Sequence, residues 1–215
     1  INFFDSAEGY GSGGSETALG KGVAGKRDQV IIATKASPSI SPDLQNVPGK
    51  PIVFTKEILF QKAEDSLKRL GTDYIDLYLL HAPDKATPSD DDDFPHPPFG
   101  TPTLEHMQEI ADAMDALVKS GKIRYWGVSN HSAQQVSELV DLGKRPEKSP
   151  IAGLEDYYNI AAGPRRNVEK FFRKVEKNEM FPVIRKGDLG LMAYSPLGEG
   201  RLVPGRKVEE GPALV

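Results

Sequence analysis

The feature that most constrains the fold of this chain is the regular alternation of short apolar runs with longer amphipathic segments. The apolar runs are rich in β-branched and aromatic residues, and they predict strands at 1–4 (buried), 30–34, 74–80, 123–128, 151–154 and 190–194. The other segments have the apolar spacing of helices, at 15–24, 56–70, 104–120, 133–142 and 166–177. Strands that alternate with helices predict a parallel sheet, because parallel neighbours require a crossover connection.

Local signals mark the ends of several predicted helices. Ser132 is followed three residues later by Gln135, which predicts a capping box at the start of the helix at 133–142. Gly71 and Gly121 stand just past two other helices, at the position where a left-handed residue is favoured.

Polar side chains follow the predicted strands in turn, and they are Asp5, Lys35, His81, Ser129–Asn130, Glu155 and Ser195. An open doubly wound sheet concentrates its chemistry at a single crevice, whereas a barrel places polar residues after every strand. The sequence therefore predicts an α/β fold of the (β/α)8 TIM-barrel type, seen here without its first and last strands. No linker divides the chain, so residues 1–215 are expected to form a single domain.

The composition excludes several classes of protein. Hydrophobic residues make up 38% and charged residues 27% of the chain, as in ordinary soluble proteins. The net charge of -4 argues against nucleic acid as a partner, and no apolar run approaches the roughly 20 residues of a membrane span. The chain has no cysteine, which excludes disulfides, thiol catalysis and cysteine-ligated zinc and fits a cytoplasmic location.

We expect no metal site. The residues His96, His106 and His131 have no convergent partners in the sequence pattern. The acidic run Asp90–Asp93 lacks the alternating ligand spacing of a calcium loop and is interpreted as a solvated loop.

Four polar groups are placed to act together on a carbonyl group. Asp5 closes the first strand, Tyr10 lies in the following loop, and Lys35 and His81 close the next two strands. Reduction of a carbonyl by hydride leaves negative charge on its oxygen, which a tyrosine can protonate. The reference pKa of tyrosine, about 10, makes it a reluctant donor, and a neighbouring lysine ammonium would lower that pKa. Asp5 would keep Lys35 charged and oriented, and His81 could donate a hydrogen bond to the same oxygen.

The sequence around these residues resembles the aldo-keto reductase family. The similar blocks occur in family order along nearly the whole chain: DSAEGYG (5–11), SE (15–16), LG (19–20), ATK (33–35), LKRLGTDYIDLYLLH (67–81), GKIR (121–124), GVSN (127–130) and AYSPLG (193–198). Each block is modestly specific alone, and together they are very specific. The resemblance implies reduction of a small-molecule aldehyde or ketone to an alcohol by hydride transfer from NADPH, without metal or flavin.

The resemblance also implies a catalytic role for each of the four polar groups. Tyr10 would be the general acid, and Lys35 would lower the pKa of Tyr10. Asp5 would be the partner of Lys35, and His81 would polarise or orient the carbonyl. Taken alone, each of these residues also has an ordinary structural explanation, such as a surface tyrosine or a core histidine, and the surrounding motifs favour the catalytic one.

The cofactor contacts are implied in the same way. Ser129 and Asn130 would hold the nicotinamide carboxamide, and Tyr194 would stack on the nicotinamide ring. The loop after this tyrosine, with Ser195 and Leu197, would contact the pyrophosphate.

The sequence departs from the family pattern in two respects. Glu155, four residues before Asn159, stands where the family usually has a glutamine that grips the carboxamide. A glutamate can accept from the amide nitrogen but cannot donate to the amide oxygen. In addition, the family's first strand and helix would precede Ile1, and its last strand and the basic segment that contacts the adenosine 2′-phosphate would follow Val215. We therefore expect a piece of a longer protein, and NADH stays open as an alternative to NADPH.

Two other functions remain open at this stage. A cofactor-binding regulatory subunit, similar to the beta subunits of potassium channels, would keep the barrel and the nucleotide. A truncated, inactive relative is the third hypothesis. Oligomeric state and the identity of the carbonyl substrate do not follow from the sequence.

Overall fold

A computed structural model describes residues 1–38, 52–84, 102–159, 179–200 and 202–205. Its strands are β1 (Phe3–Asp5), β2 (Ile31–Ala36), β3 (Ile75–Leu80), β4 (Ile123–Ser129), β5 (Gly153–Tyr157) and β6 (Gly190–Tyr194). Its helices are α1 (Gly14–Gly22), α2 (Lys56–Leu70), α3 (Leu104–Lys119), α4 (Ala133–Gly143) and α6 (Met180–Gly187), with 3-10 turns η1 (Arg27–Gln29) and η2 (Gly198–Gly200). All six predicted strands and four of the predicted helices are present. The helix predicted at 166–177 lies outside the described residues, and α6 was not predicted.

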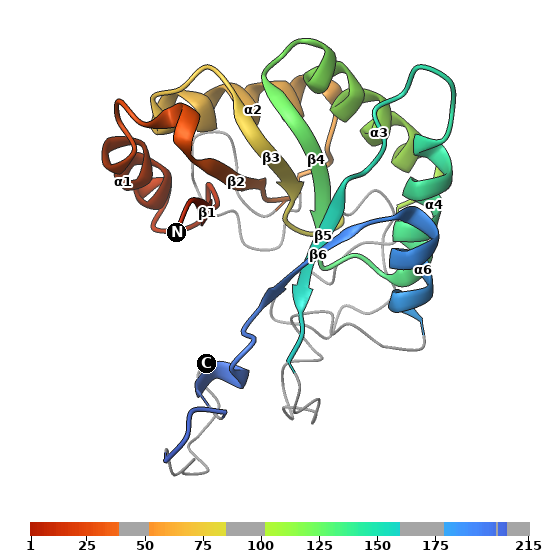
Figure 1. The fold of residues 1–215 in the computed structure, drawn as a ribbon. Coiled ribbons are helices and arrows are strands. Elements are labelled where there is room, and N and C mark those ends of the chain that lie inside the picture. The colour runs from red at the N-terminus through yellow and green to blue at the C-terminus, as the bar shows by residue number, and fades with distance from the viewer. Residues whose placement is uncertain (39–51, 85–101, 160–178, 201, 206–215) are drawn as a thin grey trace.

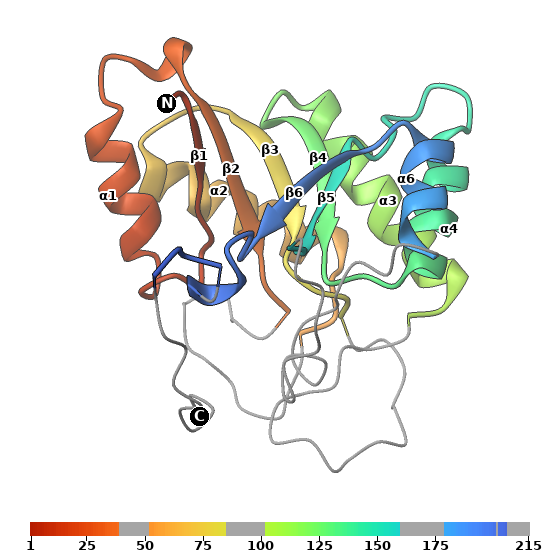
Figure 2. The same cartoon turned by 60° about the horizontal axis from the view of Figure 1, so that its bottom comes forward.

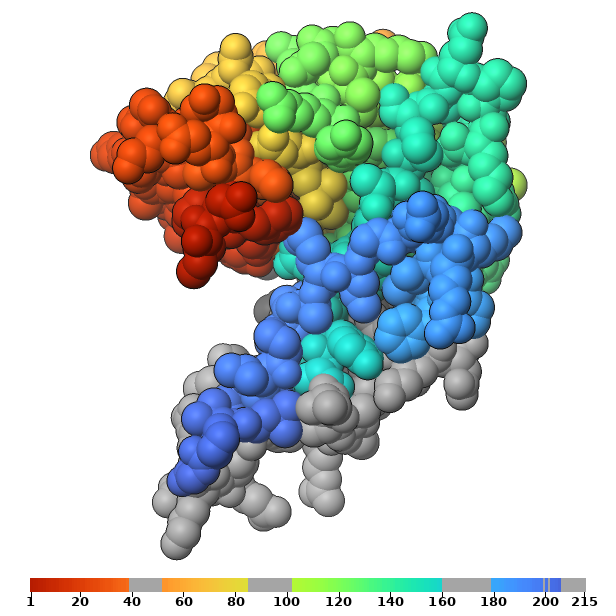
Figure 3. Space-filling model, viewed as in Figure 1, coloured from red at the N-terminus to blue at the C-terminus, as the bar shows by residue number. Residues whose placement is uncertain are grey.

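The strands form one parallel sheet in the order β1-β2-β3-β4-β5-β6. The sheet curls, and the helices lie around its outside (Figures 1 and 2). In the space-filling view, the red N-terminal segment and the blue segment near the C-terminus lie next to each other, below the yellow and green middle of the chain (Figure 3). Six consecutive parallel strands with helices on the outside are the architecture of a (β/α)8-type barrel, as predicted.

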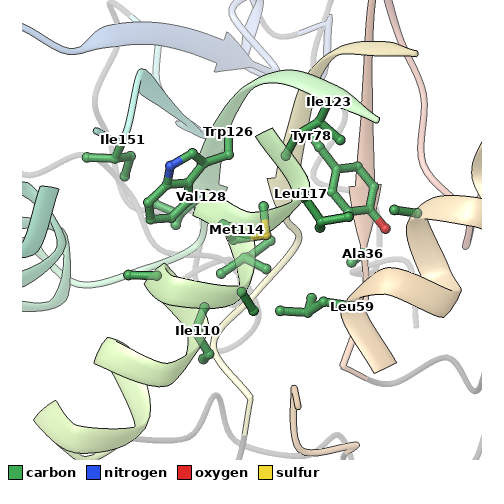
Figure 4. Close-up of a cluster of buried hydrophobic side chains, with 14 of the residues drawn as sticks. Ala36, Leu59, Tyr78, Ile110, Met114, Leu117, Ile123, Trp126, Val128 and Ile151 are labelled. Carbon is green, nitrogen blue, oxygen red and sulfur yellow. The ribbon is translucent and has the colours of Figure 1, made fainter. Parts of the chain in front are cut away.

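The main core lies between the outer face of the sheet and the helices. Trp126 and Val128 of β4 point toward Ile110 and Met114 of α3, and all four are buried (Figure 4). Trp126 also donates from its indole nitrogen to the carbonyl of Ser149 at 3.0 Å, so its one polar atom is satisfied. Burying a side chain of this size contributes roughly 2 to 3 kcal/mol.

The alternation of side chains along the strands decides which residues face the inside of the curl. Because the side-chain period of a strand is two, the neighbours of outward-facing core residues point inward. In β2 the core residues Ile32 and Ala36 place Lys35 on the inner face. In β5 the core residue Leu154 places Glu155 on the inner face, opposite Ser129 of β4 in the sheet register.

The predicted helix ends are confirmed. The Ser132 hydroxyl accepts from the backbone N–H of Gln135 at 3.2 Å, and the Gln135 side chain accepts from the backbone N–H of Ser132 at 2.8 Å. Gly71 and Gly121 both adopt left-handed backbone angles, with φ of 64° and 76°. These caps satisfy the backbone groups that a helix leaves without intrahelical partners.

Two predictions about strands were wrong. The first strand was expected to be buried, but 41% of Phe3 is exposed, because β2 alone among the described strands pairs with it. The strand expected at 151–154 begins two residues later, so Glu155 lies within β5 rather than after it. The apolar run at Ile151 is instead the approach to the strand, and it packs in the core.

Candidate active site

Lys35 is the centre of the candidate site. The side chain is fully buried on the inner face of β2, and its Nζ donates to the two carboxylate oxygens of Asp5 at 2.7 and 2.8 Å. Nζ also donates to the carbonyl of Ser6 at 2.9 Å and to the hydroxyl oxygen of Tyr10 at 3.4 Å. A fifth oxygen, Oε1 of Glu155, lies 3.3 Å from Nζ. It reaches the lysine from β5, across the inside of the curled sheet. One ammonium group therefore links three segments of the chain: residues 5–10, β2 and β5.

Tyr10 and His81 lie next to each other at the rim of this cluster. Their ring centroids are 5.8 Å apart and the rings meet edge to face. Tyr10 lies in the turn between β1 and α1, and 40% of the residue is exposed. His81 directly follows β3, and its backbone N–H donates to the carbonyl of Ala36 at 2.8 Å, which continues the sheet pairing.

The electrostatics of the four residues differ in one respect from the sequence prediction. Burial raises the pKa of Tyr10, and the carboxylates of Asp5 and Glu155 raise it further. Lys35 lowers this pKa, but by less than the other effects raise it. Burial opposes the charge of Lys35, but Glu155 and Asp5 outweigh it and raise the lysine pKa. Burial and the nearby Lys35 cation lower the pKa of His81 to about 3. At neutral pH the site therefore holds a protonated phenol, a charged lysine and a neutral imidazole.

A second polar cluster lies at the ends of β4 and β6. The amide nitrogen of Asn130 donates to the His81 carbonyl at 2.9 Å and to the Ser129 hydroxyl oxygen at 3.0 Å. The Tyr194 hydroxyl donates to the side-chain oxygen of Asn130 at 2.9 Å. Asn130 itself has a left-handed backbone, with φ of 60°, and Asp156 accepts from its backbone N–H at 2.6 Å. The structure thus brings together Ser129, Asn130 and Tyr194, which the sequence analysis had grouped.

The whole chain matches a known family. The profile described as Aldo/keto reductase family matches residues 1–213. The chain belongs to this family. Among curated proteins, it is 32% identical to the Bacillus subtilis protein named Aldo-keto reductase YhdN, over 98% of this chain and 52% of the relative. It is also 30% identical to a probable voltage-gated potassium channel subunit beta of Oryza sativa, over 94% of this chain and 52% of the relative.

Solved structures of the family share the fold. An aldo-keto reductase from Klebsiella pneumoniae in complex with NADPH superimposes with a TM-score of 0.64 and 29% identity, over 95% of this chain and 56% of that one. An aldo-keto reductase from Bacillus halodurans, in its holo form, superimposes with a TM-score of 0.70 and 26% identity, over 100% and 59%. The chain spans about half the length of the curated relatives that it matches.

The other residues predicted to bind cofactor lie in two places in this chain. Ser195 and Leu197 lie in the turn after β6, where Ser195 has a positive φ of 53° and the Leu197 side chain is exposed. Glu155 is paired in register with Ser129 of β4, and its carboxylate contacts Lys35. A contact between Glu155 and the nicotinamide carboxamide stays a prediction.

Sequence reasoning missed Asp156. Its carboxylate is buried and accepts from the backbone of Asn130, which fixes that residue in its left-handed conformation. The available signal was an acidic residue at an outward position of a strand, where charge is rare unless it is paired.

The histidines also have partners that the sequence did not indicate. His106 Nε2 lies 2.7 Å from Oδ2 of Asp84, and His131 Nδ1 lies 2.8 Å from the Ser129 carbonyl. His96 and the acidic run Asp90–Asp93 lie outside the described residues. Within the described ranges, no group of three or more potential metal ligands is present. No helix in this part of the chain is long and apolar enough to cross a membrane.

Proposed function

We propose that this chain carries the active site of an enzyme that reduces a small-molecule aldehyde or ketone to an alcohol with NADPH, and that Tyr10 donates the proton. The observation that carries this proposal is the position of Tyr10, a partly exposed residue whose hydroxyl lies 3.4 Å from the buried ammonium of Lys35. A donor that meets solvent on one side and a fixed cation on the other can reach a substrate and still stabilise its own conjugate base.

The four residues have distinct parts in this chemistry. Tyr10 holds its proton at neutral pH, because its ordinary pKa of about 10 is raised further by burial, and the proton is therefore present for donation. Lys35 then stabilises the phenolate that forms, while Asp5 holds Lys35 in place through two short hydrogen bonds. His81 is neutral, because its pKa is about 3, and a neutral ring N–H can hydrogen-bond the carbonyl oxygen.

The cluster at the ends of β4 and β6 suits a nicotinamide. When bound, the reduced nicotinamide supplies the hydride to the carbonyl carbon. Asn130 Nδ2 donates to Ser129, so the Ser129 hydroxyl hydrogen is available to the carboxamide oxygen. Tyr194 presents an aromatic ring beside this polar group, which fits a flat ligand ring. The NADPH complex of the Klebsiella pneumoniae protein supports this choice of cofactor.

The test is the loss of NADPH absorbance with a reactive aromatic aldehyde, compared between the protein and its Tyr10→Phe variant. We expect turnover to fall by roughly 10²- to 10⁴-fold, the usual contribution of a general acid. NADPH binding, followed by quenching of protein fluorescence, should be retained. Equal turnover in the two proteins would show that Tyr10 is not the acid, and parallel assays with NADH compare the two cofactors.

A second candidate is a cofactor-binding regulatory subunit. It is favoured by the 30% identity to the probable potassium channel beta subunit of Oryza sativa over 94% of this chain. Tight NADPH binding with no turnover of any aldehyde or ketone, in both the protein and the Tyr10→Phe variant, would favour this function over the reductase.

A further inference from the structure

Glu155, predicted from the sequence as a cofactor-binding residue, contacts the lysine at the centre of the candidate site. Its side chain is buried on the inner face of β5, and Oε1 lies 3.3 Å from Nζ of Lys35. Among the described residues, its other oxygen, Oε2, is buried and has no hydrogen-bond donor. One carboxylate oxygen therefore contacts the lysine, while the other is buried without a donor.

The charges around Lys35 do not balance. The lysine carries one positive charge, whereas Asp5 from β1 and Glu155 from β5 bring two carboxylates to it. The other titratable groups at the cluster are neutral at neutral pH: Tyr10 in the turn after β1, His81 after β3 and Tyr194 at the end of β6. Asp156 acts from the other face of β5, where it holds the backbone of Asn130. An ionised Glu155 thus makes the surroundings of the Tyr10 hydroxyl more negative.

We propose that Glu155 is a second counter-ion of Lys35, which holds Tyr10 in its protonated, proton-donating form, and that it is not a ligand of the nicotinamide carboxamide. The catalytic half of this proposal rests on the proposed function of Tyr10. The geometric half rests on the contact between Glu155 and Lys35. Glu155 is accordingly a positioning residue, because it acts on Tyr10 through the lysine.

Titration of Glu155 fits this role. Burial raises the pKa of Glu155 from 4.5 to about 7, although Lys35 opposes the rise. Below this pH Glu155 is mainly protonated, and its interaction with the nearby Asp5 also favours the protonated form. Above it, the ionised carboxylate opposes ionisation of Tyr10, whose pKa it raises. The tyrosine is thus kept as a donor in the alkaline range, where it would otherwise begin to lose its proton.

The consequence concerns the direction of the reaction. Reduction needs the phenol as a proton donor, whereas oxidation of an alcohol needs the phenolate as a proton acceptor. A residue that disfavours the phenolate therefore favours reduction. Removing the charge of Glu155 should extend alcohol oxidation to lower pH and make carbonyl reduction fall off at lower pH.

The experiment is an ultraviolet titration of the Tyr10 phenolate in the cofactor-free protein. Subtracting the spectrum of the Tyr10→Phe variant in the same background removes the other tyrosines. In Glu155→Gln, which keeps the shape and removes the charge, the phenolate population at a fixed pH below the midpoint should rise roughly tenfold. Asp141→Asn makes the same change in net charge at an exposed site on α4 and should leave the titration unchanged.

Glu155→Asp serves as the second variant if the glutamine variant does not fold. It keeps the charge and should preserve the Tyr10 titration of the parent protein. An unchanged titration in a folded Glu155→Gln protein would overturn the proposal, and so would tighter NADPH binding without a change in titration, which would make Glu155 a cofactor ligand. A shifted titration with full activity of Tyr10→Phe would keep the counter-ion role and overturn the proposed function of Tyr10. The two failures are therefore distinguishable.

Discussion

The burial of Glu155 has a consequence for stability that can be measured without substrate or cofactor. Its pKa is raised from 4.5 to about 7, so the folded state holds a proton that the unfolded chain releases earlier. The stability from this group is present in full below pH 4.5 and is lost as the pH rises through 7. The loss amounts to up to about 3 kcal/mol, by linkage of protonation to folding. Glu155→Gln should therefore gain stability relative to the parent between pH 5 and pH 8, as measured by urea unfolding. A difference in unfolding free energy that does not change with pH would contradict the assignment.

At the residue scale, the sequence predicted which residues meet at the ends of adjacent strands. It did not predict contacts that depend on the curvature of the sheet. Asp5, Lys35 and His81 were predictable as neighbours, because the carboxyl ends of adjacent parallel strands meet at one edge. The contact of Lys35 with Glu155 crosses from β2 to β5, which are not adjacent. Only the curvature of the sheet brings these two side chains together, and no local pattern encodes it.

At the element scale, the packing of α1 against α2 depends on one glycine. A Cβ at Gly20 would overlap the backbone carbonyl of Leu70, whereas a Cβ at Gly22 would have no atom within 4 Å. Gly20→Ala should therefore lower the free energy of unfolding by about 1–3 kcal/mol, because the helices must separate. Gly22→Ala is the matched control in the same helix and should be neutral or stabilising by up to about 1 kcal/mol. Thermal or urea unfolding of the two variants checks this, and equal effects would show that α1 does not approach α2 so closely.

The predictions of elements failed where the polarity of a segment did not match its structure. Helix α6 was missed because it has only eight residues and contains Pro182, a residue usually interpreted as a helix breaker although it is tolerated in the first turn. Strand β5 was placed too early because its second half carries Glu155 and Asp156, which an apolar pattern excludes. Both acids are paired within the structure, so the strand tolerates them.

At the scale of the whole molecule, the carboxyl ends and the amino ends of the strands carry different clusters of charged residues. The candidate site lies at the carboxyl ends of the strands, while a second cluster lies toward the amino ends of β3 and β4. There the ring of Tyr74 lies between the guanidinium groups of Arg27 and Arg124, with their carbons 3.9 and 4.0 Å from the ring centroid. The buried Asp76 accepts from Arg27 at 2.6 Å, from Arg124 at 3.0 Å and from the backbone of Ile32 at 3.0 Å. This second cluster ties three segments together on the side of the barrel that usually serves stability rather than catalysis.

Because the two clusters lie at opposite ends of the strands, an Asp→Asn change should mainly affect stability at one cluster and mainly affect turnover at the other. Asp76→Asn should lower the free energy of unfolding by about 2 kcal/mol, because it leaves Arg27 and a buried N–H with a weaker acceptor, and should leave turnover unchanged. Asp5→Asn should lower turnover roughly tenfold or more, because Lys35 loses its closest partner. Its effect on stability should stay within about 1 kcal/mol, since Asp5 is partly exposed and Lys35 retains Glu155 and the Ser6 carbonyl. Urea unfolding and carbonyl reduction, each measured on both variants, test these two expectations. If Asp76→Asn lost turnover at full stability, the amino ends of the strands would have to be counted as part of the functional site.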